Sequence, residues 1–100
     1  MNDATLIQIR DAIRNGTASA RQWTDRTLDR IQALEPKLHA LLEYDGDRAM
    51  DRAEVIDEKI ARGQTVGPLA GVPLLIKDNL CTAWGRTTCA SRILEHFFAP

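Results

Sequence analysis

The sequence contains only two cysteines, Cys81 and Cys89, among its 100 residues. Small secreted proteins that are held together by disulfides carry more, so this scarcity favours a reduced, intracellular compartment. The spacing of the two cysteines is not a zinc pattern, and no paired histidines follow them. We expect both to be small buried apolar residues, with a disulfide as the less favoured interpretation, and no metal or cofactor site in this chain.

Long apolar runs are also missing. No stretch approaches the roughly 20 apolar residues that a membrane-spanning helix requires. Residues 1–5 mix polar and charged side chains and lack the basic start and apolar stretch of a signal peptide. We therefore expect a cytoplasmic protein without membrane partners, and an organelle stays open as the alternative.

The sequence has no excess of charge of one sign. Its 13 basic and 14 acidic residues leave a net charge of -1, so a surface built to hold the phosphate backbone of RNA is not expected in this segment. Hydrophobic residues make up 44% and charged residues 27%. These proportions predict one small folded domain, not a disordered chain.

The first 63 residues carry helical patterns. Apolar residues recur at helical spacing over 6–13, and Gly16 follows as a C-terminal cap. Ser19 opens a second helix with Gln22 in capping-box position, and Pro36 is expected to stop it. The apolar stripe of this second helix consists of Trp23, Thr27, Ile31 and Leu34.

A third helix is expected after a short connection. Residues 38–44 are apolar and are either a strand or a tight connection, because periodicity does not separate the two. Asp47 is the expected N-cap of the third helix, and Arg62 followed by Gly63 ends it. Its apolar side consists of Ala49, Ala53, Ile56 and Ile60, and its solvated side of Asp51, Glu54, Asp57, Glu58 and Arg62.

The pattern changes after Gly63. Glycines and prolines crowd into 67–73, which indicates a structured loop, and the apolar run 72–77 predicts a strand covered on both faces. Hydroxyl side chains between Thr87 and Ser91 are placed to cap a last helix from Cys89 to Phe97.

These expectations describe an incomplete α/β fold. A buried strand needs parallel neighbours and covering helices, and the sequence does not supply enough strands for a sheet. We therefore interpret residues 1–100 as the N-terminal part of one domain. Its parts are a helical 1–63, a glycine-rich loop and lysine-bearing strand over 64–79, and a loop and helix over 80–100.

Lys77 is the most informative residue for function. A lysine in water is protonated, but burial among apolar neighbours lowers the pKa of a lysine because it disfavours the charged form. A neutral lysine then serves as a base that activates a serine hydroxyl. The competing interpretation is a lysine that ends a strand with its ammonium in water, paired with the neighbouring Asp78.

The segment from Gly67 to Asn79 resembles the opening motif of the amidase-signature family. In this sequence it reads Gly-Pro-Leu-Ala-Gly-Val-Pro, three apolar residues, and Lys-Asp-Asn. The stretches Leu28–Ala40 and Thr87–Glu95 are similar to the branch of that family that forms the A subunits of tRNA-dependent amidotransferases. The resemblance runs over almost the whole chain, and the 67–79 motif is its most specific part.

The resemblance implies a mixed-sheet domain with a Ser–cis-Ser–Lys triad in which Lys77 is the base. The nucleophilic serine would attack the side-chain amide of glutamine, form an acyl-enzyme and release ammonia. In the amidotransferase branch, a B subunit would use ATP and magnesium to convert Glu-tRNA(Gln) to Gln-tRNA(Gln), and a C subunit completes the heterotrimer. Glutamine and misacylated tRNA are thus the implied substrates of the complex.

The two family serines belong to a glycine- and serine-rich stretch downstream of the lysine, which this sequence does not contain. Its own serines are Ser19 and Ser91, and Ser91 is interpreted as a helix-start residue. We therefore expect the 100-residue chain alone to lack amidase activity. The family also places glycine at the position of Trp84, whereas this chain has Gly85 one place later, so the loop is either shifted by one residue or diverged.

Other sites have less support. The glycines of 67–73 lack the order of a phosphate-binding loop, and His39 and His96 are isolated and are interpreted as surface or capping residues. Two alternatives to the amidotransferase reading stay open: a stand-alone amidase, and a non-catalytic helical interaction module.

Overall fold

The computed structural model describes residues 4–100, so the charged start at residues 1–3 lies outside the described residues. The chain divides into two compact units. The first, called the helical unit here, comprises residues 4–38 and 45–73. The second, called the loop unit, comprises residues 39–44 and 74–100.

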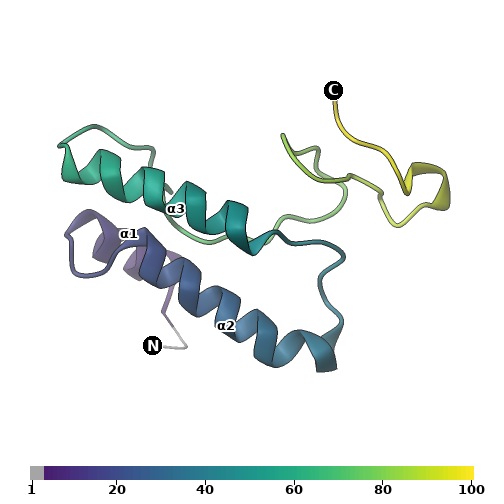
Figure 1. Cartoon of the computed structure of the whole chain (residues 1–100), viewed down its shortest axis with the longest axis horizontal. Helices are drawn as coiled ribbons and strands as arrows, with labels where there is room; N and C mark the ends of the chain where they lie inside the picture. Colours follow the sequence, from purple (N-terminus) through teal and green to yellow (C-terminus); the bar gives the residue numbers. More distant parts are fainter. Residues whose placement is uncertain (1–3) are drawn as a thin grey trace. The chain divides into compact units, whose positions relative to one another are not determined.

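The helical unit is built from α1 (Leu6–Arg14), α2 (Ala20–Leu38) and α3 (Gly46–Ala61), and α2 and α3 lie side by side (Figure 1). Its core contains Ile13 of α1, Ala20 and Trp23 of α2, and Ala53 of α3. Packed against this core are Ala4, Ile9, Ala18, Ile56, Ile60 and Val72. The expected apolar stripes thus supply the core, although Leu34 at the far end of its stripe is exposed.

The helix ends follow local capping chemistry. Ser19 and Gln22 form the expected capping box, with the Ser19 hydroxyl accepting from the Gln22 N–H at 3.0 Å and Gln22 Oε1 accepting from the Ser19 N–H at 2.9 Å. Thr5 and Gln8 form a second capping box at α1. Gly63 takes a φ of 71° after α3, and its N–H donates to the Ile60 carbonyl, as in a glycine-terminated helix.

Two helix boundaries differ from the sequence-based expectation. Helix α2 continues past Pro36 to Leu38. Pro36 stands in the last turn, so the loss of its N–H bond affects only the end of the helix and not the turns before it. His39, with a φ of 48°, ends the helix instead. Asp45, not Asp47, is the N-cap of α3: its carboxylate accepts from the Arg48 N–H at 3.0 Å.

Asp57 does not belong to a wholly solvated face of α3. Its Oδ1 accepts from the Ala20 N–H at 2.7 Å and its Oδ2 from the Arg21 N–H at 3.0 Å. Asp57 thereby satisfies two of the free N–H groups at the start of α2, where the helix dipole also favours a negative charge. It therefore joins α3 to α2.

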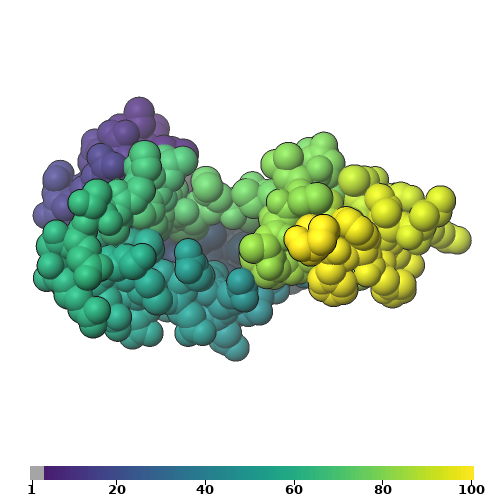
Figure 2. Space-filling view, turned by 90° about the horizontal axis from the view of Figure 1, so that it is seen from above, coloured from purple at the N-terminus to yellow at the C-terminus, as the bar shows by residue number. Residues whose placement is uncertain are grey.

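The loop unit consists mainly of irregular chain, and Figure 2 shows its green-to-yellow residues gathered against one another. Of the ambiguous residues 38–44, Leu38 ends α2 and residues 39–44 form a connection with no strand. The chain also forms no strand over 72–77, and Leu75 in this stretch is 69% exposed. A strand is defined by bonds to a neighbouring strand, and among residues 4–100 the only such pairing is an isolated antiparallel bridge between Arg86 and Phe98. The described chain therefore shows the helices of the expected α/β fold but none of its sheet.

The helix expected from Cys89 to Phe97 is reduced to the 3-10 turn η1 (Arg92–Leu94), which follows Ser91. Cys89 and Ala90 have φ values of 51° and 57°, which a right-handed helix does not allow. The N–H of Thr87 also donates to the Phe97 carbonyl at 3.0 Å, so Phe97 is drawn out of a helical path.

Candidate active site

Lys77 lies in the loop unit at the end of the irregular stretch 72–77, and its side chain is exposed. The expected burial among apolar neighbours is thus not formed by the described residues, because the sheet that would cover this stretch is absent from residues 4–100. The backbone of Lys77 is held by a turn in which its carbonyl accepts from the Leu80 N–H at 3.0 Å. Its role as a base stays a prediction.

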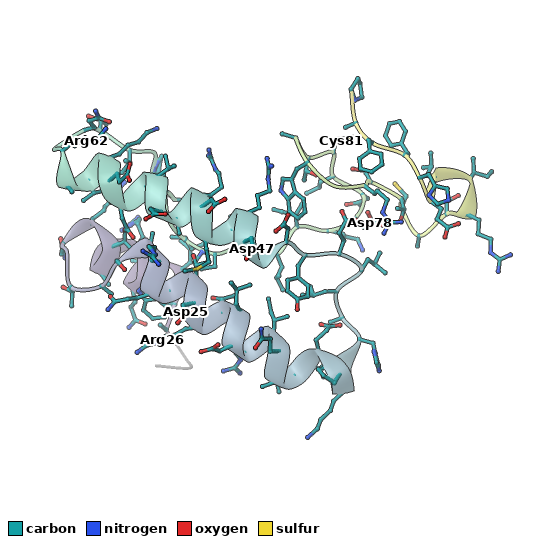
Figure 3. The ribbon with its side chains drawn as sticks, in the orientation of Figure 1. Asp25, Arg26, Asp47, Arg62, Asp78 and Cys81 are labelled. Carbon is teal, nitrogen blue, oxygen red and sulfur yellow. The ribbon has the colours of Figure 1, made fainter. Side chains whose placement is uncertain are left out.

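Asp78 makes no ion pair with Lys77 within the described part of the chain; its carboxylate binds Thr88 instead. Oδ1 accepts from the Thr88 N–H at 2.9 Å, and Oδ2 accepts from the Thr88 hydroxyl. The Asp78 carbonyl also accepts from the Cys89 N–H at 3.0 Å. Hydrogen bonds from the Thr88 hydroxyl and N–H lower the pKa of Asp78, so the charged carboxylate is the favoured form. Figure 3 shows Asp78 on an irregular segment, not on a helix.

Thr88 begins a tight turn that ends at Ser91. The Ser91 N–H donates to the Thr88 carbonyl at 2.9 Å, and both central residues, Cys89 and Ala90, have left-handed φ values. Such a turn normally carries Asn-Gly, because side chains other than glycine are strained in this conformation. The bonds from Asp78 therefore hold a turn that its own sequence does not favour.

A second carboxylate, Glu43, organises the neighbouring loop. Its Oε1 accepts from the Arg86 N–H at 3.0 Å, and its Oε2 is 3.1 Å from Arg86 Nε. The pKa of Glu43 is lowered, first by the backbone hydrogen bond and then by the side-chain bond from Arg86. Arg86 also donates from Nη1 to the Glu95 carbonyl at 3.2 Å. Glu43 thus joins chain that precedes the Lys77 segment to chain that follows it.

Gly85 has the left-handed φ of 71°, and a Cβ at this position would collide with Glu43 Oε1. The glycine one place after Trp84 therefore supplies the unusual backbone angle in this chain. This supports the interpretation that the loop is shifted by one residue.

The motif glycine Gly71 has a packing role in the helical unit. Its φ is 83°, and a Cβ placed on it would lie 2.8 Å from Ala20 Cβ and 3.3 Å from Ile13 Cδ1. The backbone of the glycine-rich loop therefore approaches the helices more closely than any other residue would allow. Gly67, the first glycine of the motif, has no atom within 4 Å of such a Cβ.

The remaining candidate residues do not gather into a site. His39 and His96 are exposed, and Ser19 is used as a helix cap. Ser91 precedes η1, and its side chain makes no capping hydrogen bond. Cys81, labelled in Figure 3, and Cys89 are free and exposed, so the expectation that they are buried is wrong: the loop unit has no apolar core to receive them.

Sequence reasoning missed Thr88 and Glu43 as partners of the segment around Lys77. Thr88 stands ten residues from Asp78 and Arg86 stands 43 from Glu43, and no local pattern pairs them.

Within residues 4–100 no group of three or more His, Cys, Asp or Glu residues lies close enough together to hold a metal ion. No helix in the same range has the length and apolar composition to cross a membrane.

Comparison with known proteins places these residues in context. The family model for Amidase matches residues 22–100. The A subunit of glutamyl-tRNA(Gln) amidotransferase from Synechococcus sp. (strain WH7803) is 53% identical over 95 residues. The proteins of the same name from Prochlorococcus marinus (strain MIT 9313) and Trichormus variabilis are 53% and 45% identical over 95 and 97 residues.

These alignments cover 95% to 97% of this chain and 20% of each relative, so the chain spans about a fifth of the length of the curated relatives that it matches. No solved structure matches the chain.

Proposed function

The chain belongs to the amidase family, and on that premise we propose that it is the N-terminal segment of the glutamine-hydrolysing component of a tRNA-dependent amidotransferase. The observation that carries this proposal is the identity of about half of all residues to glutamyl-tRNA(Gln) amidotransferase A subunits over nearly the whole chain. The alignment includes Lys77 and the glycine-rich loop before it.

Within this proposal Lys77 is the base of the reaction. Through a bridging serine it takes the proton of the nucleophilic serine, which then attacks the side-chain amide of glutamine. The protonated lysine returns the proton to the amide nitrogen, the C–N bond breaks, ammonia leaves and an acyl-enzyme remains, which water later hydrolyses to glutamate. Both serines lie in the part of the longer protein that follows this segment.

The exposed apolar residues of the loop unit support a place inside a larger domain. Leu74, Leu75, Ile76, Ile93 and Phe98 each expose more than half of their surface. A large exposed apolar surface is rare on a complete soluble protein. We propose that the rest of the longer protein covers it and that residues 72–77 join the sheet of an α/β domain, where the Lys77 side chain becomes enclosed.

The ammonia is passed on in this proposal. A B subunit uses ATP and magnesium to activate the glutamate on misacylated tRNA, ammonia converts it to Gln-tRNA(Gln), and a C subunit completes the cytoplasmic heterotrimer. This chain itself holds neither the nucleotide nor the metal. A stand-alone amidase that acts on other amides is the alternative within the same family.

A chimaeric protein tests the proposal. This chain replaces the matching N-terminal segment of the Synechococcus relative, and the chimaera is assembled with B and C subunits. We expect glutamine-dependent formation of Gln-tRNA(Gln) at a rate within about tenfold of the parental complex, since a misplaced active-site group typically costs about 100-fold. A chimaera that folds and assembles but releases no ammonia from glutamine would refute the proposal.

A further inference from the structure

The Asp78 carboxylate has two possible partners: the ammonium of its sequence neighbour Lys77, and the backbone and hydroxyl of Thr88. Both of its oxygens bind Thr88. Sequence neighbours of opposite charge do pair elsewhere in this chain: Arg10 and Asp11 form an ion pair at 2.9 Å. In this structure the Asp78 carboxylate is thus bound by Thr88, and no ion pair joins it to Lys77 within the described residues.

The partner of the Asp78 carboxylate affects whether Lys77 can act as a base. A carboxylate within about 4–6 Å of an ammonium favours the charged form, and a charged lysine accepts no proton. By holding Asp78, Thr88 leaves the Lys77 amine without this partner. The same bonds tie the backbone just after Lys77 to the Thr88–Ser91 turn, while the Leu80 N–H fixes the Lys77 carbonyl.

We propose that Thr88 and Asp78 are positioning residues for Lys77: Thr88 holds the Asp78 carboxylate away from the lysine amine and fixes the backbone from which the lysine extends. This inference rests on the proposed function of Lys77 as a base. The other charged groups that act on Asp78 are Arg86 and Glu43, which are paired with each other at 3.1 Å and are unchanged in the variants below.

The first test is a pH titration of the Lys77 side-chain resonances by NMR in the 100-residue chain. Thr88→Val removes the side-chain hydroxyl and keeps the branched shape of the side chain. The loss of the hydroxyl frees Asp78 Oδ2. We expect the Lys77 titration midpoint to rise by about 0.5 pH unit, the size of an exposed ion pair. Adding Asp78→Asn to Thr88→Val removes the charge and should return the midpoint to the wild-type value.

Two further variants test whether the change in the Lys77 titration depends on the Thr88 hydroxyl and not on any substitution in this turn. Thr88→Ser keeps the hydroxyl and should behave as wild type. Ser91→Ala changes a hydroxyl of the same turn that makes no capping bond, and it should also behave as wild type. An unchanged midpoint in Thr88→Val, or a shift that persists with Asp78→Asn, would overturn the proposal.

The second test uses the chimaeric amidotransferase. In Thr88→Val the acid limb of the kcat/KM profile for glutamine should move up by about 0.5 pH unit, which lowers kcat/KM about threefold on that limb and leaves the alkaline plateau unchanged. An acid limb that stays at the wild-type pH would contradict the positioning role. If Lys77→Ala keeps full activity, the proposed function fails instead, and the NMR result still decides the competition for Asp78.

Discussion

Asp57 of α3 binds the backbone of Ala20 at the start of α2, with Oδ1 2.7 Å from the Ala20 nitrogen. Ala20 is fully buried, so its N–H has no access to water. The second oxygen of Asp57 binds the next N–H, that of Arg21. A side chain 37 residues away thus completes a helix end that the local capping box leaves unsatisfied.

We predict that Asp57→Ala destabilises the helical unit by about 1–2 kcal/mol, since it removes a charged cap and leaves a buried N–H without an acceptor. Urea unfolding followed by circular dichroism measures the change. Asp51→Ala, at an exposed position of the same helix, is the matched control and should change stability by less than about 0.5 kcal/mol. Equal effects of the two substitutions would show that the cap contributes nothing.

We predict that Gly71→Ala destabilises the helical unit by about 1–3 kcal/mol. The added Cβ meets Ala20 Cβ, which belongs to a short and rigid side chain, and the left-handed φ adds strain. Gly67→Ala, where a Cβ meets open space, should be nearly neutral. Thermal melts of the two variants test this, and a Gly71→Ala chain as stable as wild type would show that the loop does not pack on the helices.

We predict that acid releases the two carboxylate contacts of the loop unit. The pKa values of Asp78 and Glu43 are lowered in the folded chain, so their contribution to stability is present above the unfolded values of about 4 and is lost as the pH falls through the lower folded values. The amide resonances of Thr88 and Arg86 should shift with midpoints below the unfolded pKa values of Asp78 and Glu43, respectively. The Leu80 N–H, bound to a backbone carbonyl, serves as control. Midpoints at or above the unfolded values would refute the assignment.

We predict that the 100-residue chain alone releases no ammonia from glutamine above the buffer rate. Ser19 is a helix cap and Ser91 lies outside any serine-rich motif, so the chain offers the proposed base without a nucleophile. A sensitive coupled ammonia assay measures this. Activity that disappears in Ser91→Ala would instead identify a nucleophile within this chain.

Local patterns predicted the features that local physics decides. The Ser19–Gln22 capping box, the end of α3 at Gly63 and the core position of Trp23 follow from residues within one or two helical turns of each other. The helix boundaries expected at Pro36 and Asp47 each differ from the observed ones by about two residues, the usual uncertainty at a helix end.

Features that depend on distant partners were not predictable in the same way. The strand over 72–77 requires neighbouring strands that residues 4–100 do not provide, and the positions of Cys81 and Cys89 depend on a core that the loop unit lacks. The contact of Asp78 with Thr88 joins the family-like motif 67–79 to the family-like stretch 87–95, yet only the structure shows that Thr88, not Lys77, takes the carboxylate.

The most direct test of the account is ammonia release from glutamine by the chimaeric amidotransferase with Lys77→Ala and Lys77→Arg beside wild type. Arginine keeps the positive charge but does not act as a base at neutral pH, so both variants should lose at least about 100-fold in kcat while remaining folded and assembled. Only the wild-type lysine would then support catalysis. Activity retained in either variant would contradict the assignment of Lys77 as the base, and with it the catalytic role proposed for this segment.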